Sequence, residues 1–232
     1  NIVNFLYNKN DMIKLFIKKI INLLLSENIY ILPTFIGFNK GNWSVLKKNS
    51  FSQYIGTYEI ELLPHIVKKI KFNNYKIIYD IGASYGYYSS YFAKKTKAKV
   101  FSFEPENKPY EILNKLRKKI GPNLNVINKF LASKDSENSI SIRNAFKIYG
   151  IPDFIKMDIE GQEEKLLIEN INLFVNKKIT LIIEVHSKKI ENSIIKAFNG
   201  INYSAEIIDN NLSTLKIRNV DFNRWIILQY IK

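Results

Sequence analysis

The stretch from Ile77 to Ala93, IIYDIGASYGYYSSYFA, constrains the fold of this chain more than any other. An apolar run ends near Asp80, a tight turn with Gly82 and Gly86 follows, and an aromatic-rich segment comes next. This order predicts a buried strand, a glycine turn and the start of a helix. Glycine permits backbone torsions and a close ligand approach that a β-carbon would obstruct. A strand that delivers a carboxylate and a small-residue loop to a helix N-terminus builds one half of a nucleoside-binding crevice.

The next apolar run, residues 99–103, leads into Glu104 and Pro105. An acidic residue at this point holds a ribose diol, because its carboxylate oxygens accept both hydroxyl protons. The spacing fits a dinucleotide as well as S-adenosylmethionine. The loop separates the two, since Tyr87 replaces the third glycine of G-x-G-x-x-G. Asp80 ahead of the first glycine would repel a pyrophosphate but can accept an ammonium group, so the charges favour S-adenosylmethionine.

Two later apolar runs also end in titratable residues. One leads into Asp158 and Glu160, and the other contains Glu184 and leads into His186. The carboxyl edge of an α/β sheet is where its ligands bind. Four strands that all end in such residues are difficult to explain as solvated surface. We therefore expect these side chains to face the same crevice as the glycine loop.

Strand-like and helix-like segments alternate along the chain. We expect strands near 76–81, 98–103, 124–129, 153–158 and 179–185, and helices near 59–72, 85–95, 107–120, 162–174 and 188–199. This βαβα order predicts an α/β fold with a doubly wound, mostly parallel sheet covered on both faces. Residues 202–208, with either 211–218 or 224–230, would close the sheet, and residues 139–143 alternate like a small edge strand.

These motifs together resemble the FkbM family of S-adenosylmethionine-dependent methyltransferases. The family pattern is D-[VI]-G-A-N-x-G-x-Y-[ST], then F-E-P, then D-F-I-K-[IM]-D-[VI]-E-G, then a strand ending [IL]-E-x-H. The matching segments are Asp80 to Ser89, Phe103 to Pro105, Asp153 to Gly161, and Glu184 with His186. The resemblance covers roughly residues 56–184. There are two departures: Ser84 replaces an asparagine, and Lys134 stands where the family often has an aspartate, with Asp135 following.

The resemblance implies a class I, Rossmann-like methyltransferase with a seven-stranded sheet. It implies S-adenosylmethionine as cofactor and O-methylation of a hydroxyl on a small molecule or glycan. The implied cofactor-binding residues are Asp80, Gly82, Ala83, Ser84, Tyr85, Gly86, Glu104, Pro105, Leu131, Ala132 and Asp158. Methyl transfer depends mainly on alignment, but a base helps a poorly acidic hydroxyl. The candidate bases are Asp158, Glu160 and His186.

Composition excludes several other chemistries. The 232 residues suffice for one α/β domain and an appended segment. No cysteine is present, which excludes disulfides, Cys-ligated zinc and thiol catalysis. With only His65 and His186 as histidines, we expect no metal site. No signal-peptide pattern occurs, so we expect a cytoplasmic protein, and the first residue, Asn1, is compatible with a piece of a longer product.

The formal charge of +14 has two interpretations. It is compatible with a polyanionic partner, which would make the chain an RNA methyltransferase. Alternatively, it reflects a composition rich in Ile, Lys and Asn, as expected from an AT-rich genome. Small lysine clusters occur at 68–71, 94–99 and 115–119, without an arginine-rich, aromatic-interleaved run. We favour a solvated surface.

The N-terminal region, residues 1–57, is predicted to be an extension to a methyltransferase domain at 58–232. Asp11 precedes an amphipathic helix at 12–25 that is too short and too lysine-interrupted to span a bilayer. It would pack on the domain, form a homodimer, or lie on a membrane surface. Residues 30–57 look irregular and would either cover an active site or wrap the surface.

Rival interpretations use the same residues. Gly82 to Gly86 spells G-x-S-x-G, and Ser84, Asp158 and His186 occur in the order of a hydrolase triad. The predicted nucleophile elbow, however, follows the first confident strand, and no oxyanion motif precedes it. Glu160 could simply cap a helix, and His186 could be scaffolding. A binding protein without catalysis is the remaining alternative.

Overall fold

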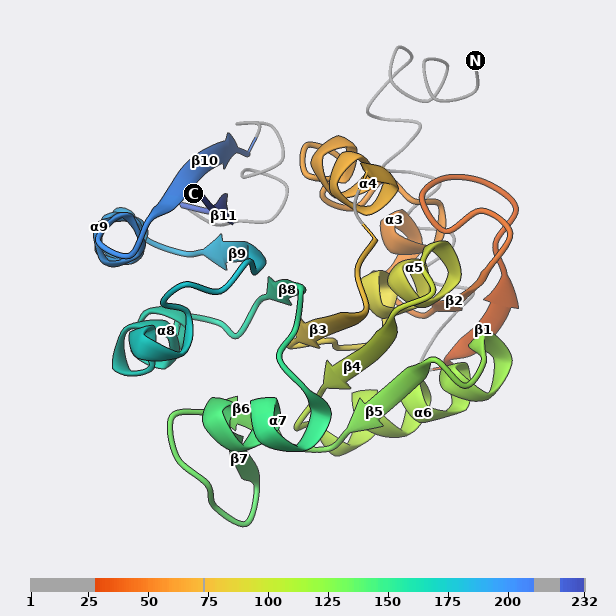
Figure 1. Ribbon diagram of the computed structural model, residues 1–232. Helices are drawn as coiled ribbons and strands as arrows, with labels where there is room; N and C mark the ends of the chain where they lie inside the picture. Colours follow the sequence, from red (N-terminus) through yellow and green to blue (C-terminus); the bar gives the residue numbers. More distant parts are fainter. Residues whose placement is uncertain (1–27, 73, 211–221, 232) are drawn as a thin grey trace. The chain divides into compact units, whose positions relative to one another are not determined.

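The computed structural model describes residues 28–72, 74–210 and 222–231 (Figure 1). They fall into two compact units, of which one ends at Tyr58 and the other begins at Glu59. The predicted helix at 12–25 lies outside the described residues, so its roles in packing, dimerisation or membrane contact stay predictions. Within the described part of the chain, no helix is long and apolar enough to cross a membrane.

The first unit contains a hairpin where we expected irregular structure. Strand β1 (Tyr30–Pro33) pairs antiparallel with β2 (Trp43–Leu46), and the short helix α3 (Phe51–Tyr54) follows. The hydroxyl of Tyr54 donates a hydrogen bond of 2.9 Å to the carbonyl of Pro33, which ties the helix to the hairpin. Its role as a cover segment stays a prediction.

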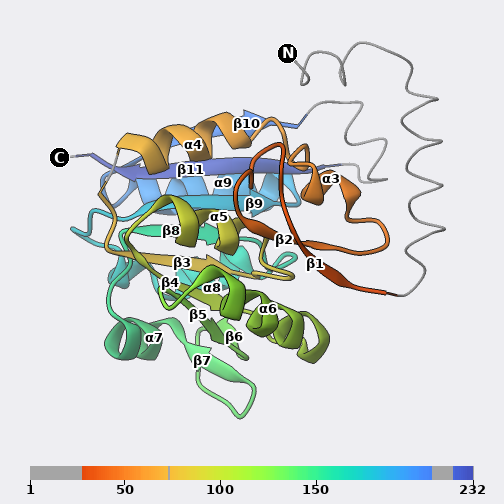
Figure 2. The same cartoon turned by 90° about the vertical axis from the view of Figure 1, so that its right-hand side faces the viewer.

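The second unit is built on a seven-stranded sheet of order β10-β11-β9-β8-β3-β4-β5. The strands are β3 (Ile77–Ile81), β4 (Lys99–Phe103), β5 (Leu124–Ile127), β8 (Phe154–Met157), β9 (Thr180–Val185), β10 (Tyr203–Asp209) and β11 (Arg224–Tyr230). The five strands from β9 to β5 are parallel, and β11 runs antiparallel to both neighbours. Figure 2 shows the strands one above another. The predicted doubly wound, mostly parallel sheet is confirmed, and residues 224–230 supply the antiparallel strand.

Helices cover both faces of this sheet, with α4, α5 and α6 on one and α7, α8 and α9 on the other (Figure 1). Their bounds are α4 (Leu63–Phe72), α5 (Tyr87–Lys95), α6 (Asn107–Ile120), α7 (Ile142–Tyr149), α8 (Glu163–Glu169) and α9 (Lys188–Asn199). Pro64 lies in the first turn of α4, where its missing N–H costs nothing. Helix α8 ends earlier than predicted, and a 3₁₀ turn (Ile171–Leu173) continues it.

The segment between β5 and β8 differs from the prediction. Strands β6 (Phe130–Ala132) and β7 (Ser139–Ser141) form a separate parallel pair, not an edge of the main sheet. Helix α7 begins at Ile142, within the stretch whose alternation suggested a strand. The reason is Ser141, whose hydroxyl accepts the backbone N–H of Asn144 and so caps a helix that periodicity over a few residues could not reveal.

The two faces of the sheet differ in chemistry. The face toward α7, α8 and α9 is an apolar core, in which the Tyr79 hydroxyl donates to the carbonyls of Ala145 and Gly150 at 2.9 and 2.7 Å. The face toward α5 carries buried polar residues at the carboxyl halves of the strands: Asp80, Ser102, Lys156 and Glu184. In register, Asp80 lies opposite both Ser102 and Lys156. Strand alternation places these side chains on one face.

Candidate active site

The glycine loop after β3 is hydrogen-bonded to β4. The backbone N–H groups of Gly82 and Ala83 both donate to the carbonyl of Phe103 at 3.1 Å. The N–H of Ser84 donates to Glu104 Oε2 at 2.7 Å. Through these bonds the loop and Glu104 form one unit at the carboxyl edge of two adjacent strands.

The carboxylate of Glu104 uses only part of its capacity to accept hydrogen bonds. Its residue is 5% exposed, and Oε1 accepts the N–H of Glu106 at 2.8 Å. Burial raises the pKa of Glu104, although the two backbone donors act against this rise. A carboxylate accepts about four hydrogen bonds. Two acceptor positions therefore remain after the backbone contacts, which is the number that a diol needs.

Gly82 lies in close contact with the turn after β8, and its predicted role in a close ligand approach stays a prediction. Its φ is +77°, and a β-carbon there would lie 1.8 Å from the carbonyl oxygen of Asp158. At Gly86, a β-carbon would lie 2.4 Å from Leu113 of α6. The loop is thus packed against the turn after β8 on one side and against α6 on the other. Gly82 in particular brings Asp158 beside the loop.

Asp80 lies beneath the loop and is 1% exposed. The hydroxyl of Ser89 on α5 donates to Asp80 Oδ2 at 2.5 Å, and Ser102 donates to Ser89 at 2.8 Å. Burial raises the pKa of Asp80, and Lys156 and Ser89 oppose this effect. The visible role of Asp80 is to join β3 to the helix that follows the loop. Its contact with a ligand's ammonium group stays a prediction.

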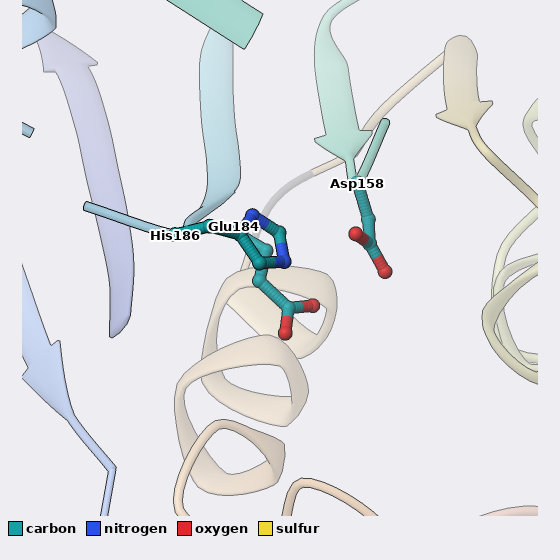
Figure 3. Close-up of side chains that lie close together, drawn as sticks. All are labelled: Asp158, Glu184 and His186. Carbon is teal, nitrogen blue, oxygen red and sulfur yellow. The ribbon is translucent and has the colours of Figure 1, made fainter. Parts of the chain in front are cut away.

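Asp158, Glu184 and His186 converge at the ends of the neighbouring strands β8 and β9 (Figure 3). One ligating atom from each side chain lies within 4.8 Å of the other two. Lys156 Nζ is 3.3 Å from Asp158 Oδ2, and the Lys156 residue is 2% exposed. Asn223 donates to Glu184 Oε1 at 2.5 Å. The sequence predicted all three of these residues at this edge of the sheet, and the structure brings them together.

The pKa values of the two acids in this cluster shift in opposite directions. Burial acts to raise the pKa of Asp158, but Lys156 and neighbouring donors hold it below the usual 3.8. Burial, with Glu59 and Asp158, raises the pKa of Glu184 well above 4.5. For Lys156, burial acts to lower the pKa, yet Asp158 and Glu59 outweigh it and the pKa rises. Asp158 and Lys156 are consequently a charged pair at neutral pH.

Glu160 lies at the exposed margin of this group. Its φ is +53°, its side chain is 87% exposed, and Oε2 lies 3.7 Å from His186 Nε2. No side-chain hydrogen bond caps α8 at its N-cap residue, Gln162. Instead Glu163, which is fully buried, accepts the N–H of Ile159 at 2.9 Å. Glu163 therefore stabilises the turn, and the sequence analysis missed it.

Leu131 and Ala132 line a different cavity. It has a volume of about 690 Å³ and is lined by residues of β6, of the β6–β7 connection and of α8: Phe130, Leu131, Ala132, Ser133, Lys134, Asp135, Ser136, Ser139, Ile159, Gln162, Lys165, Leu166 and Glu169. Neither Glu104 nor the glycine loop is among them. Pro105 lies on the Glu104 side of this region. The side chain of Asn128, just before β6, donates to the carbonyls of Glu104 and Pro105, each at 3.0 Å. The adenine contact at Leu131 and Ala132 stays a prediction.

Asp135 has a structural task. It accepts hydrogen bonds from the N–H and hydroxyl of Ser141 at 3.0 and 2.9 Å and from Asn144 at 2.7 Å. The N–H of Ser141 is the largest reason why the pKa of Asp135 lies below its usual value. Asp135 thus holds the start of α7, where the chain departs from the FkbM pattern.

Neither the family models nor the curated proteins contain a match to this sequence. Solved structures do match. An O-methyltransferase from Bacillus cereus in complex with SAH is 15% identical with a TM-score of 0.51, over 74% of this chain and 80% of that one. Precorrin-6y C5,15-methyltransferase from Geobacter metallireducens GS-15 is 11% identical with a TM-score of 0.51, over 72% and 87%. A fibrillarin in a fibrillarin/Nop5p complex is 18% identical with a TM-score of 0.53, over 88% and 98%.

The chain has the class I methyltransferase fold. At these identities the similarity establishes the fold alone, and the FkbM resemblance rests on the sequence motifs. The matched proteins have unlike names, which do not select an acceptor.

Proposed function

We propose that this chain is an S-adenosylmethionine-dependent O-methyltransferase that acts on a hydroxyl of a small molecule or glycan. The observation that carries the proposal is the hydrogen-bonded unit of the glycine loop and Glu104 at the carboxyl edge of β3 and β4. In a doubly wound sheet this edge is where nucleoside ligands bind. The fold and the FkbM-like motifs support the same assignment.

The residues present fit this cofactor. Glu104 keeps two acceptor positions for the ribose hydroxyls after its backbone contacts. The turn at Asp158 contacts the loop at Gly82, which would bring the reacting end of the cofactor beside the cluster of titratable side chains. The complete proposed binding set is Asp80, Gly82, Ala83, Ser84, Tyr85, Gly86, Glu104, Pro105, Leu131, Ala132 and Asp158.

Bound S-adenosylmethionine would supply a methyl group already activated on a sulfonium sulfur. The residues of this chain would align an acceptor hydroxyl with that methyl group, which is where most of the acceleration arises. As the methyl group passes from sulfur to the acceptor oxygen and S-adenosylhomocysteine is left, the hydroxyl proton would have to leave. Asp158, Glu160 and His186 are the proposed bases, and His186 with the nearby carboxylate of Glu160 forms a pair suited to accept it.

The position of the basic residues favours a small molecule or glycan over RNA. The last turns of α4, α5 and α6 carry the lysine clusters, at Lys69 and Lys71, at Lys94 and Lys95, and at Arg117, Lys118 and Lys119. Each helix runs from the carboxyl edge of the sheet to its amino edge. The lysines therefore lie at the edge opposite the proposed site, where they would not guide a polyanion to it.

Titration calorimetry with S-adenosylhomocysteine, S-adenosylmethionine and NAD tests the cofactor assignment. We expect one binding site for each of the first two ligands and none for NAD, since Asp80 and Tyr87 replace the features of a pyrophosphate loop. Equal or tighter binding of NAD would overturn the proposal. Methyl transfer from labelled cofactor to mixed sugar and phenol acceptors then tests the acceptor class.

A further inference from the structure

The cluster of Asp158, Glu184 and His186 has the composition and geometry of a cation site. Glu184 lies in β9, and Asp158 and His186 directly follow the adjacent parallel strands β8 and β9. Their ligating atoms lie within 4.8 Å of one another (Figure 3). Two carboxylates and one imidazole are thus gathered at the carboxyl ends of two neighbouring strands.

Individual atoms of the cluster are available to a cation. Asp158 Oδ1 and His186 Nδ1 are buried and have no hydrogen-bond partner within the described residues. The other oxygen of Asp158 faces Lys156, and the other nitrogen of His186 faces Glu160. Asp158 and His186 are therefore each positioned through one atom, while Asp158 Oδ1 and His186 Nδ1 make no hydrogen bond among the described residues. Ligands held by a second partner in this way are typical of metal sites.

The surroundings carry more negative than positive charge. The buried ammonium group of Lys156 interacts with Asp80, Asp158, Glu59 and Glu184. Glu163 adds a further carboxylate that is fully buried, interacts electrostatically with Asp158 and His186, and has Oε2 without a partner in the described chain. One lysine cannot balance these groups, which leaves the site attractive to a cation.

We propose that Asp158, Glu184 and His186 bind a divalent cation of the Mn²⁺ to Zn²⁺ range. The mixed set of oxygen and imidazole ligands suits these ions, whereas Ca²⁺ takes six to eight oxygens and Mg²⁺ keeps mostly oxygen and water ligands. Three protein ligands leave positions for further oxygen ligands. This differs from our expectation of no metal site, which counted histidines and not the carboxylates that could join one of them.

The consequence for catalysis rests on the proposed function. A cation here would hold the acceptor oxygen and lower the pKa of its hydroxyl, so that less work is left for a base. Asp158 and His186 would then act as ligands. Glu160, which is exposed and 3.7 Å from His186, would remain to accept the proton.

Binding of MnCl₂ alone tests the proposal without any need for an acceptor. After treatment with EDTA and its removal, Mn²⁺ binding is followed by calorimetry and by the loss of the free-ion electron paramagnetic resonance signal. We expect one site per chain. The variants Asp158→Asn and His186→Asn should each weaken it at least about tenfold. His65→Asn, which removes the other histidine beside an acid, is the matched control and should leave it unchanged.

Melting curves without metal establish that each variant is folded, and Glu184→Gln provides a third variant if one is not. Absence of saturable binding up to about 1 mM overturns the proposal, as does equal binding by His186→Asn. Binding of S-adenosylhomocysteine without Mn²⁺ binding would remove the cation site and leave the proposed function. Mn²⁺ binding without binding of either cofactor form would do the reverse.

Discussion

Buried acids gather at one edge of the central sheet, and three clusters of basic residues lie at the other. At the carboxyl edge lie Glu104, Asp158, Glu160 and Glu184, two of which are almost wholly buried. At the amino edge lie the last turns of α4, α5 and α6 with their exposed lysines. The fold itself separates them, because strand ends and helix starts share one edge while helix ends share the other. Cations at helix C-termini are also favoured by the helix dipole.

This separation shows why net charge is a poor guide to the function of the chain. The +14 is a sum over the whole sequence, whereas the lysine clusters of α4, α5 and α6 lie at the amino edge of the sheet. The local charge at the carboxyl edge is acidic, and one buried lysine, Lys156, is set among the acids. An interpretation based on total charge predicts an RNA partner, whereas the local charge favours a cationic or neutral ligand.

The largest expected effect comes from removing the buried ammonium group of Lys156 at the acidic edge. Lys156→Met leaves Asp158 and Glu184 without their ammonium partner in a buried site. We expect a fall of about 3–5 kcal/mol in the free energy of unfolding, measured with urea. Lys99→Met, at the exposed start of β4, is the matched control and should change it by no more than about 0.5 kcal/mol. Equal losses of stability in Lys156→Met and Lys99→Met would mean that the buried lysine contributes no more than an exposed one.

The effect of Lys156→Met should depend on pH. The pKa of Asp158 is lowered in the folded protein. The ionised Asp158 therefore contributes to stability above pH 3.8, and this contribution is lost as the pH falls through the pKa of the folded state. The difference between parent and variant should therefore shrink on acidification below 3.8. A difference that is constant down to the acid limit would contradict the ion pair.

The backbone contact at the acidic edge gives the next largest effect. Gly82→Ala would place a β-carbon 1.8 Å from the Asp158 carbonyl, whereas Gly161, at φ +91°, has nothing within 4 Å of such an atom. We expect Gly82→Ala to cost about 3–5 kcal/mol, from torsional strain and overpacking together. Gly161→Ala should cost only the strain, about 1–3 kcal/mol. Similar melting temperatures for the two variants would contradict the contact.

Ligand binding should depend on the acidic edge through Glu104. Glu104→Ala would remove the two charge-assisted hydrogen bonds proposed to the ribose, and we expect the binding free energy of S-adenosylhomocysteine to weaken by about 1.5–3 kcal/mol. Calorimetry measures this, with Glu111→Ala on the exposed face of α6 as the control. If the two variants bind equally well, the ribose is held elsewhere.

The smallest effect is expected at the basic edge. Replacement of Lys94, Lys95 and Lys118 by glutamine should change cofactor affinity by less than about 0.5 kcal/mol, as is usual for exposed sites. Filter binding of structured RNA across a salt series, with parent and triple variant, completes the comparison. Tight binding with a steep dependence on salt that the triple variant loses would make the basic edge a nucleic-acid surface.

The sequence by itself determined the architecture and the edge at which the site lies. The alternation of segments identified the parallel strands, and the ends of those strands carried Asp80, Glu104, Asp158 and His186 to one edge. These properties are local, because strand periodicity and strand-end residues can be recognised without knowledge of neighbours. The same local pattern was insufficient at Ile142, where a hydroxyl cap and not periodicity began a helix.

Only the tertiary structure decided which of these residues meet. Glu184 lies beside Asp158 because β8 and β9 are neighbours. Glu160, whose backbone has a positive φ, lies at the exposed margin of the cluster of Asp158, Glu184 and His186. Gly82 packs against the carbonyl of Asp158, and Leu131 and Ala132 line a cavity whose lining lacks the glycine loop and Glu104. Strand order, turn torsions and close packing arise from contacts between residues far apart in sequence. No pattern within one segment encodes them.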